Sequence, residues 1–215
     1  MIHDALTFPF RGIGRYMLVI GGVLSLLISL GTIIPLLGLI IAIGASGYFT
    51  AYSFRIINTT AIGQDQACDW PEFQDIWTDL LYPWLCVLAA LLFSFGPPYI
   101  FILIFDPPRF VEIALLIIGF THMPMAFLSV AINQTMASAF WTNTIPAIQR
   151  CLNQYVILLA ILGFLTLLNI LVKRAMSGIP VAGWFLSFFL GMYALMVSAR
   201  ILGLFYHENS GIFQV

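Results

Sequence analysis

Residues 36–57 read LLGLIIAIGASGYFTAYSFRII, and the first ten of them contain no charged side chain. A helix needs about 20 residues to cross the ~30 Å hydrocarbon core of a bilayer, which is close to the length of this stretch. Its apolar residues do not alternate with polar ones, as they would in a strand of a membrane barrel. The stretch therefore predicts a membrane-spanning α-helix.

The composition of the whole chain extends this prediction. Of the 215 residues, 61% are hydrophobic and only 8% are charged, whereas a soluble domain has about 25% charged residues. A soluble protein could not cover its surface with so few charges, but helices in a bilayer satisfy their own backbone groups and need no polar surface. The sequence predicts an all-α polytopic transmembrane helical bundle.

Six apolar stretches are long enough to serve as spans of a single transmembrane domain that covers residues 1–215. They are residues 16–34, 36–57, 82–105, 110–131, 155–172 and 179–205. In the second stretch Gly38, Ala42 and Ser46 recur every four residues, so their small side chains share one helix face and let a neighbouring helix approach closely. We expect this face to pack against the first span.

The third span is irregular. Gly96, Pro97 and Pro98 interrupt it after residue 95, and proline inside a helix removes a hydrogen bond and clashes with the preceding turn. This pattern predicts a span that is either broken or re-entrant.

Residues 69–81 predict a short interfacial amphipathic helix before the third span. Aromatic and aliphatic residues such as Trp70, Phe73 and Trp77 recur at helical spacing, and Asp69 with Glu72 three residues later is a capping pattern. The helix would dock at the cytoplasmic surface, and its opposite, acidic face would meet Arg11 and Arg15 or a basic surface on a partner. Its candidate docking residues are Glu72, Asp75 and Asp79. Residues 133–154 are mixed in polarity and should also follow the interface.

The basic residues predict the orientation of the chain. If the chain has six spans, five of its eight basic residues fall on one side of the membrane and three on the other. The larger group is Arg11, Arg15, Arg55, Arg150 and Arg200, and the smaller is Arg109, Lys173 and Arg174. Basic residues favour the cytoplasm, so both termini are expected there.

Several function classes lack support in the sequence. The formal net charge is −1, so no basic surface for nucleic acid is expected. Neither a phosphate-binding loop nor an intramembrane zinc, serine or paired-aspartate motif is present. The sequence therefore predicts no enzyme, no catalytic residue, no cofactor and no metal.

Four polar residues in or near the spans are candidate functional residues. His122 is the group near mid-membrane that could titrate near neutral pH, as a proton relay or cofactor ligand, or else form hydrogen bonds to a neighbouring helix. Glu112 could pair with Arg109 three residues before it. Arg55 and Arg200, near helix ends, could extend to the interface or bind lipid phosphate.

A short internal repeat includes these two arginines. Tyr48 and Arg55 are seven residues apart and are followed by Ile, and Tyr193 and Arg200 repeat the pattern near the end of the sixth span. The repeat suggests that the helical hairpins at the two ends of the chain are related.

The motif Phe8-Pro9-Phe10-Arg11, the stretch 47–55, Gly63 and Trp70-Pro71 with Asp75 and Asp79 resemble an uncharacterised family of small prokaryotic polytopic membrane proteins, a domain of unknown function. The resemblance covers roughly residues 5–105, and Pro124-Met125 and Pro146 look like an extension seen in some bacterial members. It implies a bacterial inner-membrane protein, with no catalytic residues to carry over.

Two functions remain open. The first is a non-enzymatic structural or accessory subunit of a larger membrane assembly, whose partners are the lipid bilayer and other membrane-protein subunits or a second copy. The alternative is a small transporter or channel component, in which the break at Gly96, Pro97 and Pro98 would line a substrate site. An intramembrane enzyme is the weakest of the hypotheses.

Overall fold

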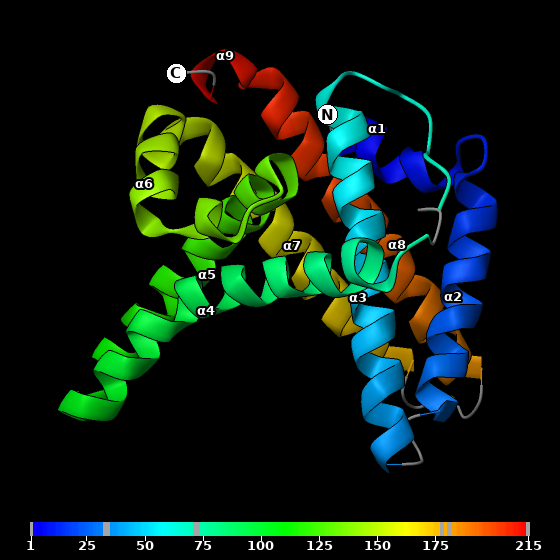
Figure 1. Ribbon diagram of the computed structural model, residues 1–215, viewed down its shortest axis with the longest axis horizontal. Coiled ribbons are helices and arrows are strands. Elements are labelled where there is room, and N and C mark those ends of the chain that lie inside the picture. The colour runs from blue at the N-terminus through cyan, green and yellow to red at the C-terminus, as the bar shows by residue number, and fades with distance from the viewer. Residues whose placement is uncertain (1, 32–34, 71–73, 177–178, 180–181, 214–215) are drawn as a thin grey trace.

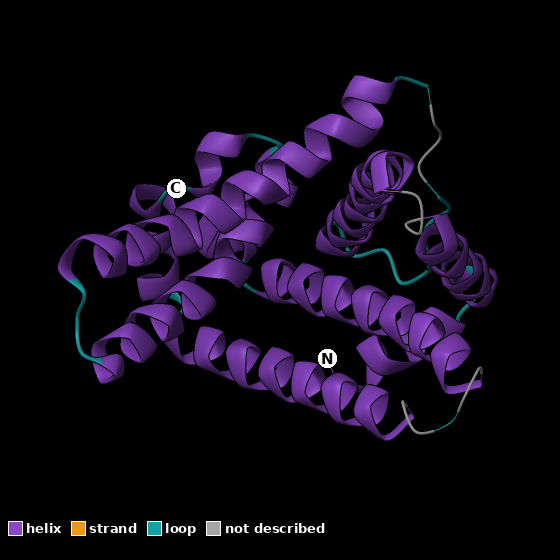
Figure 2. Ribbon diagram, turned by 90° about the horizontal axis from the view of Figure 1, so that it is seen from below, coloured by secondary structure: helices purple, strands orange, loops and turns teal. Residues whose placement is uncertain are grey.

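The structure is a computed structural model that describes residues 2–31, 35–70, 74–176, 179 and 182–213. The described residues form helices joined by loops, without a strand (Figure 2). The long helices are α2 (Gly14–Gly31), α3 (Pro35–Ala61), α4 (Tyr82–Phe105), α5 (Arg109–Asn133), α7 (Leu152–Met176) and α8 (Ala182–Glu208). The short elements are α1 (Ile2–Thr7), η1 (Phe8–Phe10), η2 (Trp77–Leu81), η3 (Met136–Ala139), α6 (Trp141–Arg150) and α9 (Ser210–Phe213).

Five of these helical stretches are long and apolar enough to cross a membrane, and a sixth is obtained if a bent pair near the N-terminus forms one span. That pair joins residues 2–10 to residues 14–27 with a bend of 73°. Such helices indicate a membrane-spanning protein. The all-α bundle predicted from the sequence is confirmed, and each predicted span overlaps one long helix.

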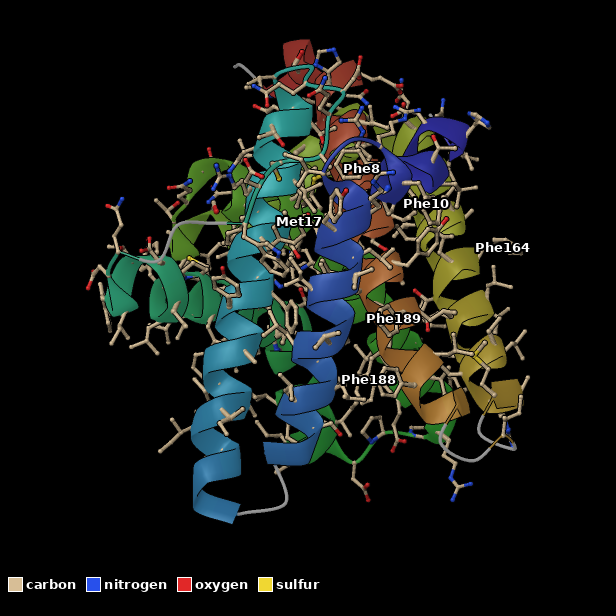
Figure 3. The ribbon with its side chains drawn as sticks, turned by 90° about the vertical axis from the view of Figure 1, so that its right-hand side faces the viewer. Phe8, Phe10, Met17, Phe164, Phe188 and Phe189 are labelled. Atoms are coloured by element: carbon tan, nitrogen blue, oxygen red, sulfur yellow. The ribbon has the colours of Figure 1, made fainter. Side chains whose placement is uncertain are left out.

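Helix α8 forms the centre of the bundle, because it contacts α2, α3 and α7 (Figure 1). Close approach depends on glycine at two crossings. A Cβ atom on Gly203 of α8 would lie 2.5 Å from the Cβ atom of Thr60 in α3. A Cβ atom on Gly22 of α2 would lie 2.6 Å from a ring carbon of Phe189 in α8 (Figure 3). Larger residues would therefore push these helices apart.

Helices α1 and α9 lie at the same end of the bundle (Figure 1). The turn between α4 and α5 and the C-terminal end of α7 lie toward the opposite end (Figure 1). In this arrangement α1 contacts α8, and α6 contacts α9.

Helices α4 and α5 pack mainly against each other and extend away from the bundle as an arm (Figure 1). Seen from below, α2 and α3 are nearly end-on, whereas α4 lies across the view (Figure 2). Near the turn of the arm, Leu103 and Phe110 are 68% and 73% exposed. The arm therefore offers a large apolar surface to whatever surrounds it.

The predicted interruption of the third span is wrong. Residues 77–105 form one helical stretch, with Pro97 and Pro98 inside α4. Proline costs a helix about 3 kcal/mol or more in isolation, so the surrounding residues must replace the lost hydrogen bond.

The predicted amphipathic helix over residues 69–81 is also wrong in its extent. Asp69, Trp70 and residues 74–75 belong to no helix, and helical structure begins at Ile76 and continues into α4. Residues 71–73 lie outside the described part of the chain. The physical reason is the position of Trp70, whose ring stacks on Tyr48 and Tyr52 of α3 at centroid distances of 5.1 and 4.4 Å. This contact holds the chain against α3.

A short amphipathic helix occurs instead at α6, within the stretch expected to follow the interface. Its apolar and polar residues are strongly segregated. Thr144 faces inward and is buried, whereas Thr142, Asn143 and Arg150 are exposed.

Candidate functional site

His122 lies in a buried polar cluster between α4, α5 and α6. The side chain is 3% exposed. Its Nδ1 atom is 2.8 Å from Oγ of Ser94 in α4, and its Nε2 atom is 2.6 Å from Oγ1 of Thr144 in α6. Together with Trp141, these residues form what we call the His122 cluster (Ser94, His122, Trp141 and Thr144).

The hydrogen bonds of the cluster assign the tautomer of the imidazole. The Thr144 hydroxyl donates to the carbonyl oxygen of Phe140 at 3.2 Å, so its oxygen accepts from Nε2–H of His122. Nδ1 is then the acceptor for the Ser94 hydroxyl. A neutral ring satisfies both contacts. His122 thus forms the interhelical hydrogen bonds that were one of its two interpretations, and a relay role stays a prediction.

Trp141 supplies the hydrogen bond that Pro97 removes from α4. In an α-helix the N–H of residue 97 would donate to the carbonyl of Phe93, and proline has no N–H. The indole Nε1–H of Trp141 donates to that same Phe93 carbonyl oxygen. The indole also stacks on His122, with ring centroids 4.2 Å apart and planes at 4°. The His122 cluster thus stabilises a continuous α4.

Arg200 of α8 forms a second polar cluster where α1, α3 and α8 meet. Its side chain is 1% exposed, and its three nitrogens all donate hydrogen bonds. Nε and Nη2 bind Asp4 Oδ2 at 3.1 and 2.9 Å, and Nη2 also binds Asp65 Oδ1 at 2.9 Å. Nη1 donates to Thr60 Oγ1 at 3.2 Å and to the carbonyl oxygen of Gln64. We call Asp4, Thr60, Asp65 and Arg200 the Arg200 cluster.

Neighbouring residues complete this cluster. The guanidinium carbon of Arg200 lies 4.9 Å from the centre of the Phe8 ring, which is fully buried beside α1 (Figure 3). Arg11 forms a second ion pair with Asp4. Asp4 is therefore held as a carboxylate between two arginines.

Neither sequence-based interpretation of Arg200 fits this geometry. A buried side chain does not extend to the interface, and its donors are occupied by protein oxygens instead of lipid phosphate. The sequence could not indicate this, because Asp4 and Asp65 are 196 and 135 residues away from Arg200.

Arg55 is exposed, and its Nη1 donates to the carbonyl oxygen of Trp70 at 3.0 Å. The two copies of the internal repeat make similar kinds of contact in the structure. Tyr48 and Arg55 hold the segment that ends at Trp70 against α3. Tyr193 donates from its hydroxyl to the carbonyl oxygen of Leu6 at 2.9 Å, beside the Arg200 cluster. Each Tyr and Arg pair thus fixes a peripheral segment to its own helix.

Two acidic residues bind backbone N–H groups where the helical stretch before α4 begins. Asp75 Oδ2 accepts from the backbone N–H of Thr78 at 3.2 Å, and Asp79 Oδ2 accepts from the N–H groups of Gln74 and Asp75 at 2.8 Å. These bonds satisfy backbone N–H groups at the start of the helical stretch, although Asp79 lies one residue beyond the position of a capping box. Asp75 and Asp79 are exposed or nearly so, so docking by them remains a prediction, and Glu72 lies outside the described residues.

Glu112 is half-buried in the first turn of α5. In the described part of the chain, no ion pair joins it to Arg109. Among the described residues there is also no group of three or more His, Cys, Asp or Glu side chains that could hold a metal ion.

Two pockets lie beside these residues. One of about 690 Å³ is bordered by the end of α5, η3, α6 and Tyr206 of α8. Another of about 420 Å³ lies where α5 leaves α3 and α8. We call the second one the apex groove; its lining residues are Ser46, Phe49, Thr50, Ser53, Phe127, Leu195, Ser198, Ala199 and Leu202.

Sequence reasoning found His122 and Arg200 but missed the residues that bind them. Ser94, Thr144, Asp4 and Asp65 were not singled out, because hydroxyls and lone carboxylates carry no spacing signal. No family model, curated protein or solved structure matches this chain, so the resemblance to an uncharacterised membrane-protein family stays a prediction.

Proposed function

We propose that this protein is a non-enzymatic structural or accessory subunit that packs against a transmembrane helix of another subunit in a larger membrane assembly. The observation that carries the proposal is the apex groove. It is an open space between α3, α5 and α8, and five of its nine lining residues have small side chains: Ser46, Thr50, Ser53, Ser198 and Ala199.

Three of the four hydroxyl groups that line the groove are already used within their own helix, α3. Ser46, Thr50 and Ser53 donate from their hydroxyls to carbonyl oxygens three or four residues earlier, at 2.7 to 2.9 Å. What remains is a shallow, weakly polar surface. Small residues gain little against lipid chains, but they let the backbone of a second helix approach closely.

The predicted packing stripe supports the same conclusion. Gly38, Ala42 and Ser46 were expected to face the first span, yet Ser46 is exposed and borders the groove with Ser198 of α8. The chain itself thus leaves part of its packing surface uncovered. Phe127 of α5 borders the groove, and large apolar side chains of α4 and α5 are exposed along the arm.

The proposal includes location and orientation. The family resemblance supports the inner membrane of a bacterium. The excess of basic residues at the end that holds α1 and α9 supports two cytoplasmic termini.

The alternative function, a transporter or channel component, was suggested by a helix broken at Gly96, Pro97 and Pro98. That support is absent, because α4 continues through these residues. A solute pathway would also need several convergent polar groups, and three of the four hydroxyls of the apex groove already donate to carbonyl oxygens of α3.

Site-specific photocrosslinking in intact membranes tests the proposed subunit role. A photoreactive amino acid at Ser46 or Ser198 is expected to give an adduct of one defined mass, because a partner helix lies in the groove. The matched control is Phe164, which is 64% exposed on the outer side of α7 (Figure 3) and is expected to meet lipid. An adduct of twice the chain mass would identify a second copy as the partner.

The absence of any protein adduct at Ser46 and Ser198, with expression and membrane insertion intact, would contradict the proposal. Equal adducts from Phe164 would show that the groove has no special role.

A further inference from the structure

Lys173 is the single lysine of the chain, and it lies in the last turn of α7. Its side chain is exposed. A Cβ atom on Gly191 of α8 would lie 3.5 Å from its Nζ atom, so the ammonium group lies beside α8 at a position that has no side chain. Side chains of a helix tilt toward its N-terminus. From the last turn of α7 that direction leads into the membrane, away from the nearer surface.

The ammonium group therefore lies at membrane depth. The candidate span of α8 begins at Phe185, and Gly191 is about 9 Å further along the helix at a rise of about 1.5 Å per residue. The midplane of a hydrocarbon core is about 15 Å from either edge. A charged side chain at such a depth is costly unless it is paired.

No group in the described part of the chain pairs with this charge. Among the described residues, Lys173 forms neither an ion pair nor a hydrogen bond. Asn169 lies four residues earlier and hence on the same face of α7. Its Oδ1 atom is buried and also lacks a hydrogen-bond partner. This face of α7 thus leaves two polar groups unsatisfied.

A small pocket of about 120 Å³ connects Lys173 with the apex groove. Phe49 of α3 and Leu195 of α8 border both spaces. Lys173 is the one charged residue among the described residues that border either space. A helix that lies in the apex groove and continues along α8 toward Gly191 therefore reaches the ammonium group.

We propose that the partner helix in the apex groove carries an aspartate or glutamate at the level of Gly191, and that its carboxylate pairs with Lys173. This inference rests on the proposed subunit role and adds the chemistry of the partner to it. The depth of the ammonium group favours a protein carboxylate over a lipid phosphate, because lipid phosphates lie outside the hydrocarbon core.

Chemical coupling in intact membranes tests the pair. Dicyclohexylcarbodiimide enters the bilayer and converts a carboxylic acid into an O-acylisourea. The lysine amine then attacks the acyl carbon, an amide bond forms, and dicyclohexylurea leaves with the amine proton. Because Lys173 is the single lysine, mass spectrometry is expected to find one branched peptide that joins Lys173 to an Asp or Glu within an apolar segment of the partner.

Two variants separate the charge of Lys173 from its reactivity. Lys173→Arg should lose the carbodiimide adduct, because a guanidinium stays protonated, and keep the photocrosslink from Ser198 within about twofold. Lys173→Met should lose both, with the photocrosslink reduced about tenfold. Arg109→Met is the matched control, since Arg109 is exposed toward the same end of the bundle (Figure 1), and it should keep both adducts.

The outcomes distinguish this inference from the subunit role. A photocrosslink from Ser198 that is unchanged in Lys173→Met, or that occurs without a carbodiimide adduct at Lys173, would overturn the pair and leave the subunit role in place. If Lys173→Met then retained less phosphatidylglycerol after purification, the ammonium group would belong to a lipid. Absence of the Ser198 photocrosslink in the unmodified chain would overturn both. Thermal unfolding of Lys173→Met should match that of the unmodified chain, which excludes misfolding as the cause of a lost adduct.

Discussion

Replacing Arg200 with Met is expected to lower the free energy of unfolding by about 3 kcal/mol and to release the N-terminal segment. Removing one partner of a buried ion pair typically costs about 3–5 kcal/mol. The lower end applies because Asp4 keeps its ion pair with Arg11 and Asp65 is 82% exposed. Arg200→Lys should recover little, because an ammonium cannot reproduce the planar fork that reaches both carboxylates.

Thermal unfolding in detergent and limited proteolysis of the N-terminal segment measure this effect. Arg55→Met is the matched control, since Arg55 is exposed and donates one hydrogen bond, to Trp70. It should cost no more than about 1 kcal/mol. The double variant Arg200→Met with Asp4→Asn should cost less than the sum of the single changes. If Arg200→Met were as stable as Arg55→Met, the Arg200 cluster would not hold α1 to the bundle.

Replacing Trp141 with Phe is expected to destabilise the protein by about 1–3 kcal/mol. The aromatic ring can still stack on His122, but the carbonyl of Phe93 loses its donor and is left unsatisfied. Pro97→Ala in the same chain should restore most of this loss, because alanine returns the helical N–H that donates to Phe93. Thermal unfolding of the two single variants and the double variant measures the rescue.

An absence of rescue by Pro97→Ala, with Trp141→Phe destabilised, would mean that Trp141 acts by packing alone.

The same measurements address His122. His122→Gln should keep stability and crosslinking at Ser198 close to those of the unmodified chain, because an amide can bond Ser94 or Thr144. His122→Leu should be less stable. Loss of crosslinking in a folded His122→Gln variant would favour a functional role for the imidazole.

The span positions could be predicted from the sequence because run length and apolarity decide whether a helix suits a bilayer. Residues 36–57 lie within α3, and residues 110–131 lie within α5. The two errors have a common physical origin. The helix continues through Pro97 because Trp141 donates to the Phe93 carbonyl. The chain at Trp70 is not helical because its ring stacks on Tyr48 and Tyr52. Local patterns contain no information about a donor or a ring supplied by another helix.

The candidate site was predictable in part for the same reason. His122 and Arg200 stand out because polar groups within apolar helices are rare and expensive. Their partners do not stand out, since Ser94 and Thr144 are ordinary helix residues and Asp4 lies in the N-terminal segment. The sequence therefore located two important side chains without showing that each is bound by its own protein.

Topology mapping tests the six-span account most directly. Reporter fusions after Asp65 and at the C-terminus should both report the cytoplasm, because an even number of spans precedes each. Fusions after Asp106 and after Met176 should both report the opposite side, since three and five spans precede them. A C-terminal fusion on the side opposite to the Asp65 fusion would contradict the account, as would an Asp106 fusion that reports the cytoplasm.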